Sequence, residues 1–272
     1  MQSEIKTLRI DEGQSQLFSG MQEENHICFA GRADQGGRAQ QQDYILLEQQ
    51  GEYLLAVVCD GMGGMEGGAQ ASRMAAEMMK QIFLQEGMED PRKFFSDCAA
   101  RIDMAVYALE ENGKRMQAGT TMVAALLQGR RLHWLSVGDS RIYLYREGQI
   151  LCPVPAHNYW LLLQEMLASG KIDRQQYIRE GSRSNASGLI SYLGIGGLPR
   201  MEMNTRAFEA QPGDMVLLCS DGLFKSLSDE EILDVIEEQI PAEEKVDMLI
   251  SAALERGGAA QDNTSAILVE IG

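Results

Sequence analysis

The sequence contains the stretch YLLAVVCDGMGG at residues 53–64, in which a continuous apolar run ends at an aspartate followed by glycines. An unbroken apolar run of this kind is typical of a strand that is buried on both faces. A single Asp-Gly pair at the end of such a strand indicates no more than a turn. The stretch therefore predicts a core strand that ends at Asp60.

Three other aspartates repeat this pattern at the edges of apolar runs, in VGDSR (137–141), LCSDG (218–222) and QDNT (261–264). Carboxylate and carbonyl oxygens are the ligands that Mg²⁺ and Mn²⁺ prefer in proteins. If the strand ends converge, the aspartates form an anionic cluster that two divalent cations would neutralise. The pattern thus favours a binuclear metal site built from Asp60, Asp139, Asp221 and Asp262.

The composition is that of a globular protein with an acidic excess, because 40 Asp and Glu face 24 Lys and Arg in 272 residues. A net charge of −16 disfavours nucleic acid and anionic membranes as partners, since both attract a basic face. No apolar run reaches the roughly 20 residues that span a bilayer, and no apolar core of a signal peptide is visible near the N-terminus. The five cysteines show no C-x-x-C spacing. We expect a cytoplasmic protein with reduced cysteines.

Eight segments have the apolar composition of strands: His26–Gly31, Tyr44–Glu48, Tyr53–Cys59, Thr120–Leu127, Leu132–Val137, Arg141–Tyr145, Met215–Cys219 and Ser265–Ile271. Helical periodicity is clear in four places: 71–82, 95–109, from Ser228 and from Pro241. This order predicts two packed sheets with helices outside them. The stretch 151–200 has Ser, Asn and Gly clusters around a short helix, Tyr159–Ala168, and predicts a mobile lobe over a site.

A further motif lies upstream, where residues 34–43 have the sequence DQGGRAQQQD. It places Arg38 five residues before Asp43. The planar guanidinium of arginine suits bidentate binding of phosphate. A single exposed arginine is usually structural or idle, so this interpretation depends on the other motifs.

In their order along the chain, these motifs resemble those of the metal-dependent protein phosphatases (PPM, the type 2C serine/threonine phosphatases), and the bacterial-type members in particular. The resemblance covers residues 29–271. Each motif is weak alone, but the ordered set is specific. The matching segments are Arg38 to Asp43, Asp60 to Gly64, Gly119 to Thr121, Gly138 to Arg141, Ser220 to Gly222 and Asp262-Asn263.

The resemblance implies an α+β fold, a four-layer α-β-β-α sandwich of two mainly antiparallel sheets packed face to face with helices outside. It implies a single catalytic domain at 26–272, an N-terminal extension at 1–25 and a variable flap at about 151–200 that influences substrate choice. The implied activity is hydrolysis of phosphoserine and phosphothreonine in proteins. The substrates would be targets of a serine/threonine kinase, and we expect a monomer.

The resemblance also implies a centre of two or three Mg²⁺ or Mn²⁺ ions in each chain. By this likeness Asp60 bridges two cations, and the carbonyl of Gly61 binds one of them. Asp221 and Asp262 bind the other cation. Asp139, together with Asp221, matches the residues that hold a third cation in bacterial-type members. The cations would activate a water or hydroxide for in-line attack on phosphorus, without a covalent protein nucleophile.

The remaining roles are carried over in the same way. Arg38 matches the arginine that binds the phosphate, so Arg38 and Asp60 are the residues expected to carry catalysis. Asp43 matches an acid near the metal-bound waters, and a ligand role and a supporting role are both open for it. Gln42 and Asn263 are expected to lie next to the metal ligands and to hold them in place without binding a cation themselves.

The sequence departs from the family pattern at several positions. Gln42 stands where many members carry Glu, which could weaken the second cation, and Gln41 replaces a common Asn. Met62 occupies a position that is His in animal members, and bacterial-type members share the Met. Ala156-His157 stands where the family often has Asp-His.

Gln42 is the main support for an alternative function that is not enzymatic. In this alternative the chain is a catalytically weak pseudophosphatase that acts as a phosphoprotein-binding or regulatory module. Against it, every residue matched to the principal metal site is an intact aspartate. A serine esterase at Gly138–Ser140 is disfavoured, because the only histidine further along the chain, His157, lies in the irregular stretch.

Overall fold

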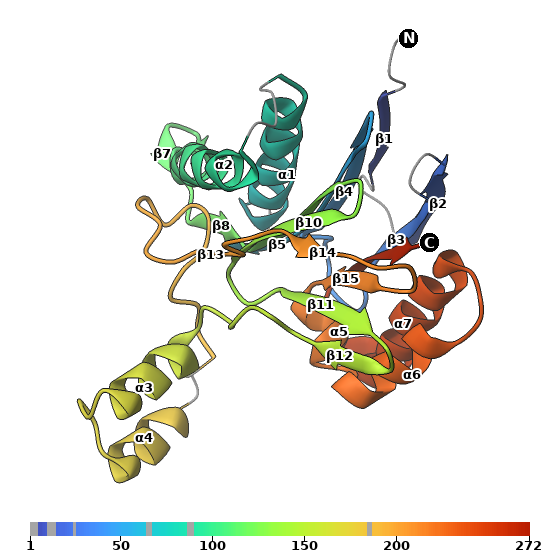
Figure 1. Cartoon of the computed structure of the whole chain (residues 1–272). Helices are drawn as coiled ribbons and strands as arrows, with labels where there is room; N and C mark the ends of the chain where they lie inside the picture. Colours follow the sequence, from blue (N-terminus) through green and yellow to red (C-terminus); the bar gives the residue numbers. More distant parts are fainter. Residues whose placement is uncertain (1–4, 10–14, 24–25, 64–66, 86–89, 184–186) are drawn as a thin grey trace.

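The structure is a computed structural model and describes residues 5–9, 15–23, 26–63, 67–85, 90–183 and 187–272. Two β-sheets pack face to face and helices cover both outer faces, so the predicted four-layer sandwich is confirmed (Figure 1). Within the described residues, no helix is long and apolar enough to cross a membrane.

The first sheet is antiparallel throughout and carries the stretch that opened the sequence analysis. Its order is β1 (Ile5–Arg9), β4 (Asp43–Gln50), β5 (Tyr53–Gly63), β9 (Met122–Gln128), β10 (Arg131–Val137) and β13 (Glu202–Met203), with β8 (Ala118–Thr120) paired to β5 and β14 (Phe208–Glu209) to β10. β9 and β10 form a hairpin that turns at Gly129-Arg130, and Gly129 has the positive φ of 56° that favours glycine in a tight turn.

The second sheet is also antiparallel, and a separate two-stranded ribbon follows α2 along the chain. The order is β12 (Gln149–Leu151), β11 (Arg141–Arg146), β15 (Met215–Cys219), β16 (Thr264–Ile271), β3 (Ile27–Asp34) and β2 (Ser15–Gln22), and the ribbon is β6 (Glu110–Glu111) with β7 (Lys114–Arg115). The segment 1–25, which we expected to be an extension, supplies an edge strand to each sheet, β1 and β2.

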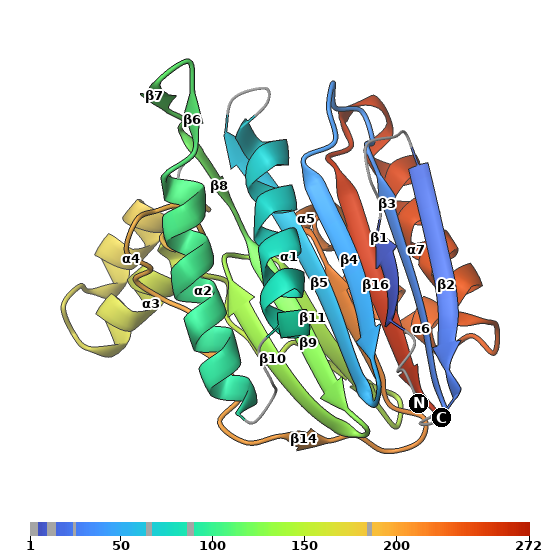
Figure 2. The same cartoon turned by 90° about the horizontal axis from the view of Figure 1, so that it is seen from above.

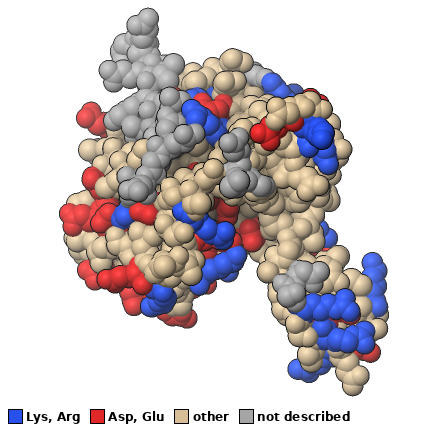
Figure 3. Space-filling view, turned by 180° about the vertical axis from the view of Figure 1, so that it is seen from behind, with Lys and Arg blue, Asp and Glu red and all other residues tan. Residues whose placement is uncertain are grey.

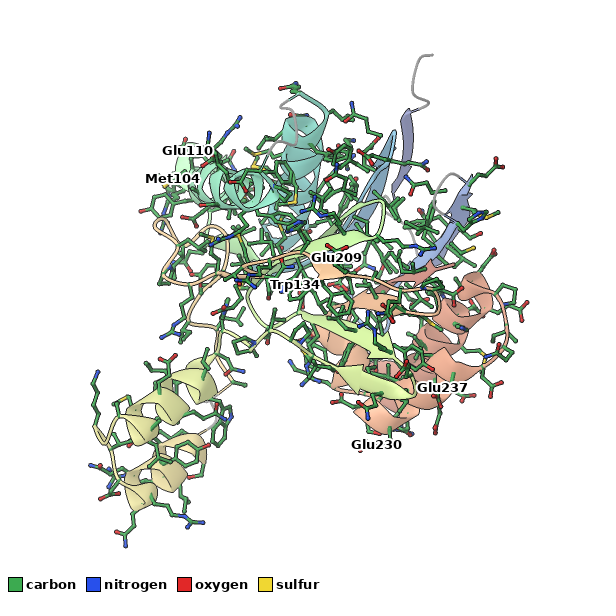
Figure 4. All side chains as sticks on the ribbon, in the orientation of Figure 1. Met104, Glu110, Trp134, Glu209, Glu230 and Glu237 are labelled. Atoms are coloured by element: carbon green, nitrogen blue, oxygen red, sulfur yellow. The ribbon has the colours of Figure 1, made fainter. Side chains whose placement is uncertain are left out.

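Helices form the two outer layers (Figure 2). α1 (Gly67–Gln85) and α2 (Pro91–Tyr107) cover the first sheet, whereas α5 (Asp221–Phe224), α6 (Asp229–Glu237) and α7 (Ala242–Gly257), followed by a short 3-10 turn (Gly258–Ala260), cover the second. The helix expected from Ser228 is α6, which Ser228 and Glu231 begin with a reciprocal capping box. Figure 4 shows Met104 on one outer helical layer, Glu230 on the other and Trp134 between them.

Adjacent residues of β5 show why its apolar run is continuous. Val58 packs between the sheets with Leu218 and Ile267, whereas Val57 packs under the helices with Ala75 and Ile102. Full burial of each large aliphatic side chain is worth about 1.5–3 kcal/mol. Because both faces of β5 are buried up to Cys59, the strand places Asp60 at the edge of the core.

The stretch 151–200 contains a helical lobe that projects from the sandwich (Figure 1). α3 (Tyr159–Ala168) begins and ends as predicted, but the second helix of the lobe, α4 (Arg174–Gly181), was not predicted. Trp160 and Tyr177 meet edge to face with ring centroids 5.8 Å apart. A Cβ at Gly181 would lie 2.3 Å from the Trp160 ring, so a glycine is needed where the helices meet.

The chain returns from the lobe through a glycine-rich loop that one buried carboxylate holds. Asp103 on α2 is 1% exposed. It accepts backbone N–H groups of Gly194 at 2.8 Å, Gly196 at 3.2 Å and Gly197 at 2.7 Å. All three glycines have positive φ, a conformation that glycine adopts without strain.

We expect Asp103→Ala to lower the free energy of unfolding by about 2–4 kcal/mol, because three amide groups lose a charged acceptor inside the fold. Urea denaturation measures the change. The matched control is Asp97→Ala, an exposed acid on the same helix, which should leave the urea midpoint where it is in the wild type. Equal midpoints for the two variants would contradict the role given to Asp103.

Candidate metal and phosphate site

Two carboxylates face each other where β4 begins and the buried part of β5 ends. The antiparallel register pairs Asp43 with Asp60 directly across the two strands. Burial raises the pKa of Asp43 to about 7, although the hydrogen bond that the Ser220 hydroxyl donates to Asp43 opposes the rise. Burial, with repulsion from Asp43 next, raises the pKa of Asp60 well above its usual range. Like charges placed opposite each other destabilise a sheet, so a bound cation or a proton would stabilise this pair.

Three more carboxylates join this pair from separate parts of the chain. Asp139 lies in the turn between β10 and β11, Asp221 is the first residue of α5, and Asp262 directly precedes the Asn263 that leads into β16. All three repel the carboxylate of Asp60. Burial, followed by repulsion from Asp221, raises the pKa of Asp139 to about 6. The structure therefore brings together the four aspartates of the sequence pattern, and Asp43 with them.

Two basic side chains of the protein lie on this cluster. Arg38 Nη2 contacts Asp262 Oδ2 at 2.6 Å, and Lys225 Nζ binds Asp221 Oδ2. The arginine was predicted as a phosphate ligand, and its pairing with a predicted metal ligand was not. The sequence analysis missed Lys225 altogether. Its position four residues after Asp221, one helical turn along α5, is the signal that could have found it.

The donor set fits a hard divalent cation. The acidic side chains supply only oxygen atoms, and Asp43 Oδ1 is buried without a hydrogen-bond partner. The carboxylates do not form a finished cage, because no three His, Cys, Asp or Glu side chains among the described residues are grouped to hold one ion. The contacts of Asp221 with Lys225 and of Asp262 with Arg38 turn two carboxylates toward side-chain cations instead.

The backbone around Asp60 is fixed by the two threonines of the Gly119–Thr121 motif. Thr121 Oγ1 accepts the Asp60 N–H at 3.1 Å, and the Thr121 N–H donates to the Asp60 carbonyl at 2.9 Å. Thr120 Oγ1 donates to the same carbonyl at 2.9 Å. Both threonines are buried, so the end of β5 has little freedom to move.

Gly61 is needed for its size. A Cβ there would lie 2.2 Å from the Gly68 carbonyl oxygen and 2.6 Å from that of Gln42. Asp43 is held from the opposite side by Ser220, whose hydroxyl donates to Asp43 Oδ2 at 2.7 Å. Because Ser220 directly precedes Asp221, one short segment positions two carboxylates of the cluster.

The loop that carries Arg38 is tied to the segment of Asp262 by Asn263. Asn263 Oδ1 accepts the Gln42 N–H at 2.8 Å, and its amide nitrogen donates to the carbonyls of Gln35 and Gln40. An open cleft of about 230 Å³ lies here, lined by Arg38, Ala39, Gln40, Gln42, Gly63, Asp262 and Asn263. The predicted phosphate ligand therefore borders a cavity beside the acidic cluster.

Comparisons with known proteins find similar phosphatases. The sequence profile of the family described as Protein phosphatase 2C matches residues 30–256. The chain is 28% identical to the serine/threonine phosphatase stp of Listeria welshimeri, over 79% of this chain and 84% of that protein. It is 31% identical to the serine/threonine protein phosphatase PstP of Mycobacterium tuberculosis, over 90% of this chain but 45% of that longer protein. A crystal structure of the PstP catalytic domain with two manganese ions superposes with a TM-score of 0.69, at 30% identity, over 90% of this chain and 98% of that one.

Proposed function

The chain belongs to the protein phosphatase 2C family, and from this membership we propose that it hydrolyses phosphoserine and phosphothreonine in proteins with the help of two or three Mg²⁺ or Mn²⁺ ions. The observation that carries the proposal is the group of five carboxylates beside a cleft bordered by Arg38. Its expected substrates are phosphoproteins made by a serine/threonine kinase, and it acts as a monomer.

In this proposal the acidic cluster holds the cations. Asp60, the Gly61 carbonyl, Asp221 and Asp262 would hold two of them, and Asp139 together with Asp221 would hold a third. When bound, these cations supply a water of lowered pKa and neutralise phosphoryl oxygens. The hydrogen bonds of Thr120 and Thr121 keep Asp60 in place for this role.

Arg38 has two anionic partners in the proposed cycle. Without substrate it binds Asp262, in an ion pair whose side chains are 59% and 39% exposed. Exposed pairs of this kind contribute at most about 1 kcal/mol, so the guanidinium can leave the carboxylate at small cost. A phosphoryl group in the cleft offers two oxygens to the guanidinium group of Arg38. When Arg38 moves to the phosphoryl group, a cation bound by Asp262 would neutralise that carboxylate in its place.

We further propose that the α3–α4 lobe is the flap that meets the phosphoprotein. Residues 159–200 contain five basic and three acidic residues, although the whole chain carries −16. Figure 3 shows Lys and Arg gathered on this projecting lobe. A basic lobe attracts an acidic or phosphorylated segment toward a protein that would otherwise repel it.

The test of the proposed function is phosphate release from a phosphothreonine peptide by the purified chain with Mn²⁺. We expect multiple turnovers, and inorganic phosphate measured against time detects them. A pseudophosphatase, the alternative that Gln42 supports, would bind the peptide without releasing phosphate. Binding without turnover, in protein that calorimetry finds loaded with Mn²⁺, would overturn the proposed activity.

A further inference from the structure

His157 lies at the root of the α3–α4 lobe and is fully buried. Its backbone N–H donates to the Gly138 carbonyl at 2.8 Å, and the Gly138 N–H donates to His157 Nδ1 at 3.2 Å. Gly138 therefore gives both of its backbone polar groups to one residue. Because Nδ1 accepts a hydrogen bond, the imidazole carries its proton on Nε2.

The other nitrogen of the ring indicates that His157 is more than packing. Nε2 is buried without a hydrogen-bond partner and lies 4.0 Å from Glu202 Oε1, which is too far for a hydrogen bond. An unsatisfied buried polar group costs about 1–3 kcal/mol. An apolar side chain would fill the site without that cost, so the feature that distinguishes histidine here is the acceptor at Nδ1.

His157 also joins the two chain segments at the root of the lobe. Its carbonyl accepts the Ile190 N–H at 2.9 Å, so the outgoing segment is bound to the returning one. The returning segment continues to Leu193, which exchanges two backbone hydrogen bonds with Thr120 at 2.9 and 3.0 Å. Hydrogen bonds thus run from the lobe to Gly138, beside Asp139, and to Thr120, which holds Asp60.

The turn that carries Asp139 is held from both sides. Gly138 has a φ of +104°, and a Cβ on it would lie 2.6 Å from Thr121 Cγ2. On the far side of Asp139, the Ser140 hydroxyl lies 2.7 Å from Thr121 Oγ1. Thr121 therefore packs against one face of the turn, and His157 binds its backbone from the direction of the lobe.

We propose that His157 is a positioning residue for Asp139: it fixes the Gly138–Asp139 peptide and so makes the third cation site depend on where the lobe sits. This inference rests on the proposed function, in which Asp139 holds the third cation. His157 acts only through Gly138 and contacts neither substrate nor cations.

Two amide substitutions separate the roles of the two ring nitrogens. In His157→Asn the amide oxygen can take the place of Nδ1, whereas in His157→Gln the amide lies nearer the place of Nε2. Calorimetric titration with Mn²⁺ resolves the weakest site from the tighter ones. We expect His157→Gln to weaken the weakest site about tenfold, the effect of one lost hydrogen bond. His157→Asn should stay within about twofold of the wild type there, and both variants should keep the tighter sites.

Steady-state kinetics provides a second readout. With the two tighter sites loaded, His157→Gln should lower kcat for phosphate release, leave KM for the peptide unchanged and recover at high Mn²⁺. The matched control is His133→Gln, a second buried histidine with an unpartnered Nδ1, which lies on β10. That change should lower the melting temperature without altering any Mn²⁺ site.

Three results would overturn the inference: wild-type Mn²⁺ binding at every site in His157→Gln, equal weakening in His157→Asn and His157→Gln, or the same weakening in His133→Gln. Failure of the proposed function is recognised separately, because the wild-type chain would then bind no Mn²⁺ or release no phosphate. Melting temperatures of all variants, recorded in parallel, identify any that do not fold.

Discussion

Removal of divalent cations with excess EDTA is expected to abolish phosphate release and to lower the melting temperature by about 5–10 °C relative to protein with saturating Mn²⁺. The physical reason is the repulsion among Asp43, Asp60 and their three acidic neighbours, which bound cations relieve. A cation present at about 100 times its dissociation constant adds about 2.7 kcal/mol at one site. Scanning fluorimetry and a phosphate assay on the same samples measure both effects. Undiminished turnover in rigorously metal-free buffer would refute the metal centre.

The pH dependence of the melting temperature of the metal-free chain tests whether repulsion among these carboxylates is the cause. Burial raises the folded pKa of Asp43 to about 7 and that of Asp139 to about 6, whereas an unfolded aspartate titrates near pH 4, at about 3.9. The folded chain therefore binds these protons more tightly, and their stabilising effect is lost as pH rises from about 4 to about 7. Asp43→Asn should make the melting temperature in EDTA less dependent on pH. An equal slope in both proteins would show that the carboxylate at Asp43 is not the cause.

The parts of the fold that the sequence predicted are those set by local pattern. Continuous apolar runs located β5 and β15, and helical periodicity located α6, because each signal lies within a short stretch of neighbouring residues. The helix α4 was missed since its segment, RQQYIREG, has no apolar stripe, and Ile178 in it is 59% exposed. The edge strand β2 was missed for a related reason: only its pairing with β3 makes the polar segment 15–22 part of a sheet.

The candidate site likewise has features that local sequence patterns indicate and contacts that only the folded chain creates. Convergence of the strand-end aspartates was the condition for the predicted metal site, and Asp139, Asp221 and Asp262 lie near enough to Asp60 to repel its carboxylate. The contacts of Arg38 with Asp262 and of His157 with Gly138 join residues that only the folded chain brings together. No periodicity or spacing in one sequence encodes them. The roles assigned to the site residues remain predictions that the variants test.

Arg38→Ala is expected to lower kcat/KM for a phosphothreonine peptide by about 30- to 150-fold at saturating Mn²⁺, which corresponds to roughly 2–3 kcal/mol for a charge-assisted bidentate contact. Arg38→Lys keeps the charge but loses the planar fork, so it should recover only part of the loss. Because Arg38 also pairs with Asp262, its removal leaves that carboxylate free for a cation. We therefore expect Mn²⁺ affinity to stay the same or to rise.

The matched control for Arg38 is Arg131→Ala. The side chain of Arg131 is 57% exposed and that of Arg38 is 59% exposed, and Arg131 also pairs with an acid, Glu209. Arg131 is the first residue of β10, at the opposite end of the strand from Asp139. Loss of a surface ion pair alone should leave kcat/KM unchanged in both variants. A specific fall in Arg38→Ala, with Mn²⁺ affinity maintained, therefore identifies the guanidinium as the phosphate ligand. If Arg38→Ala stays within about twofold of Arg131→Ala, Arg38 serves only to neutralise Asp262 before cations bind.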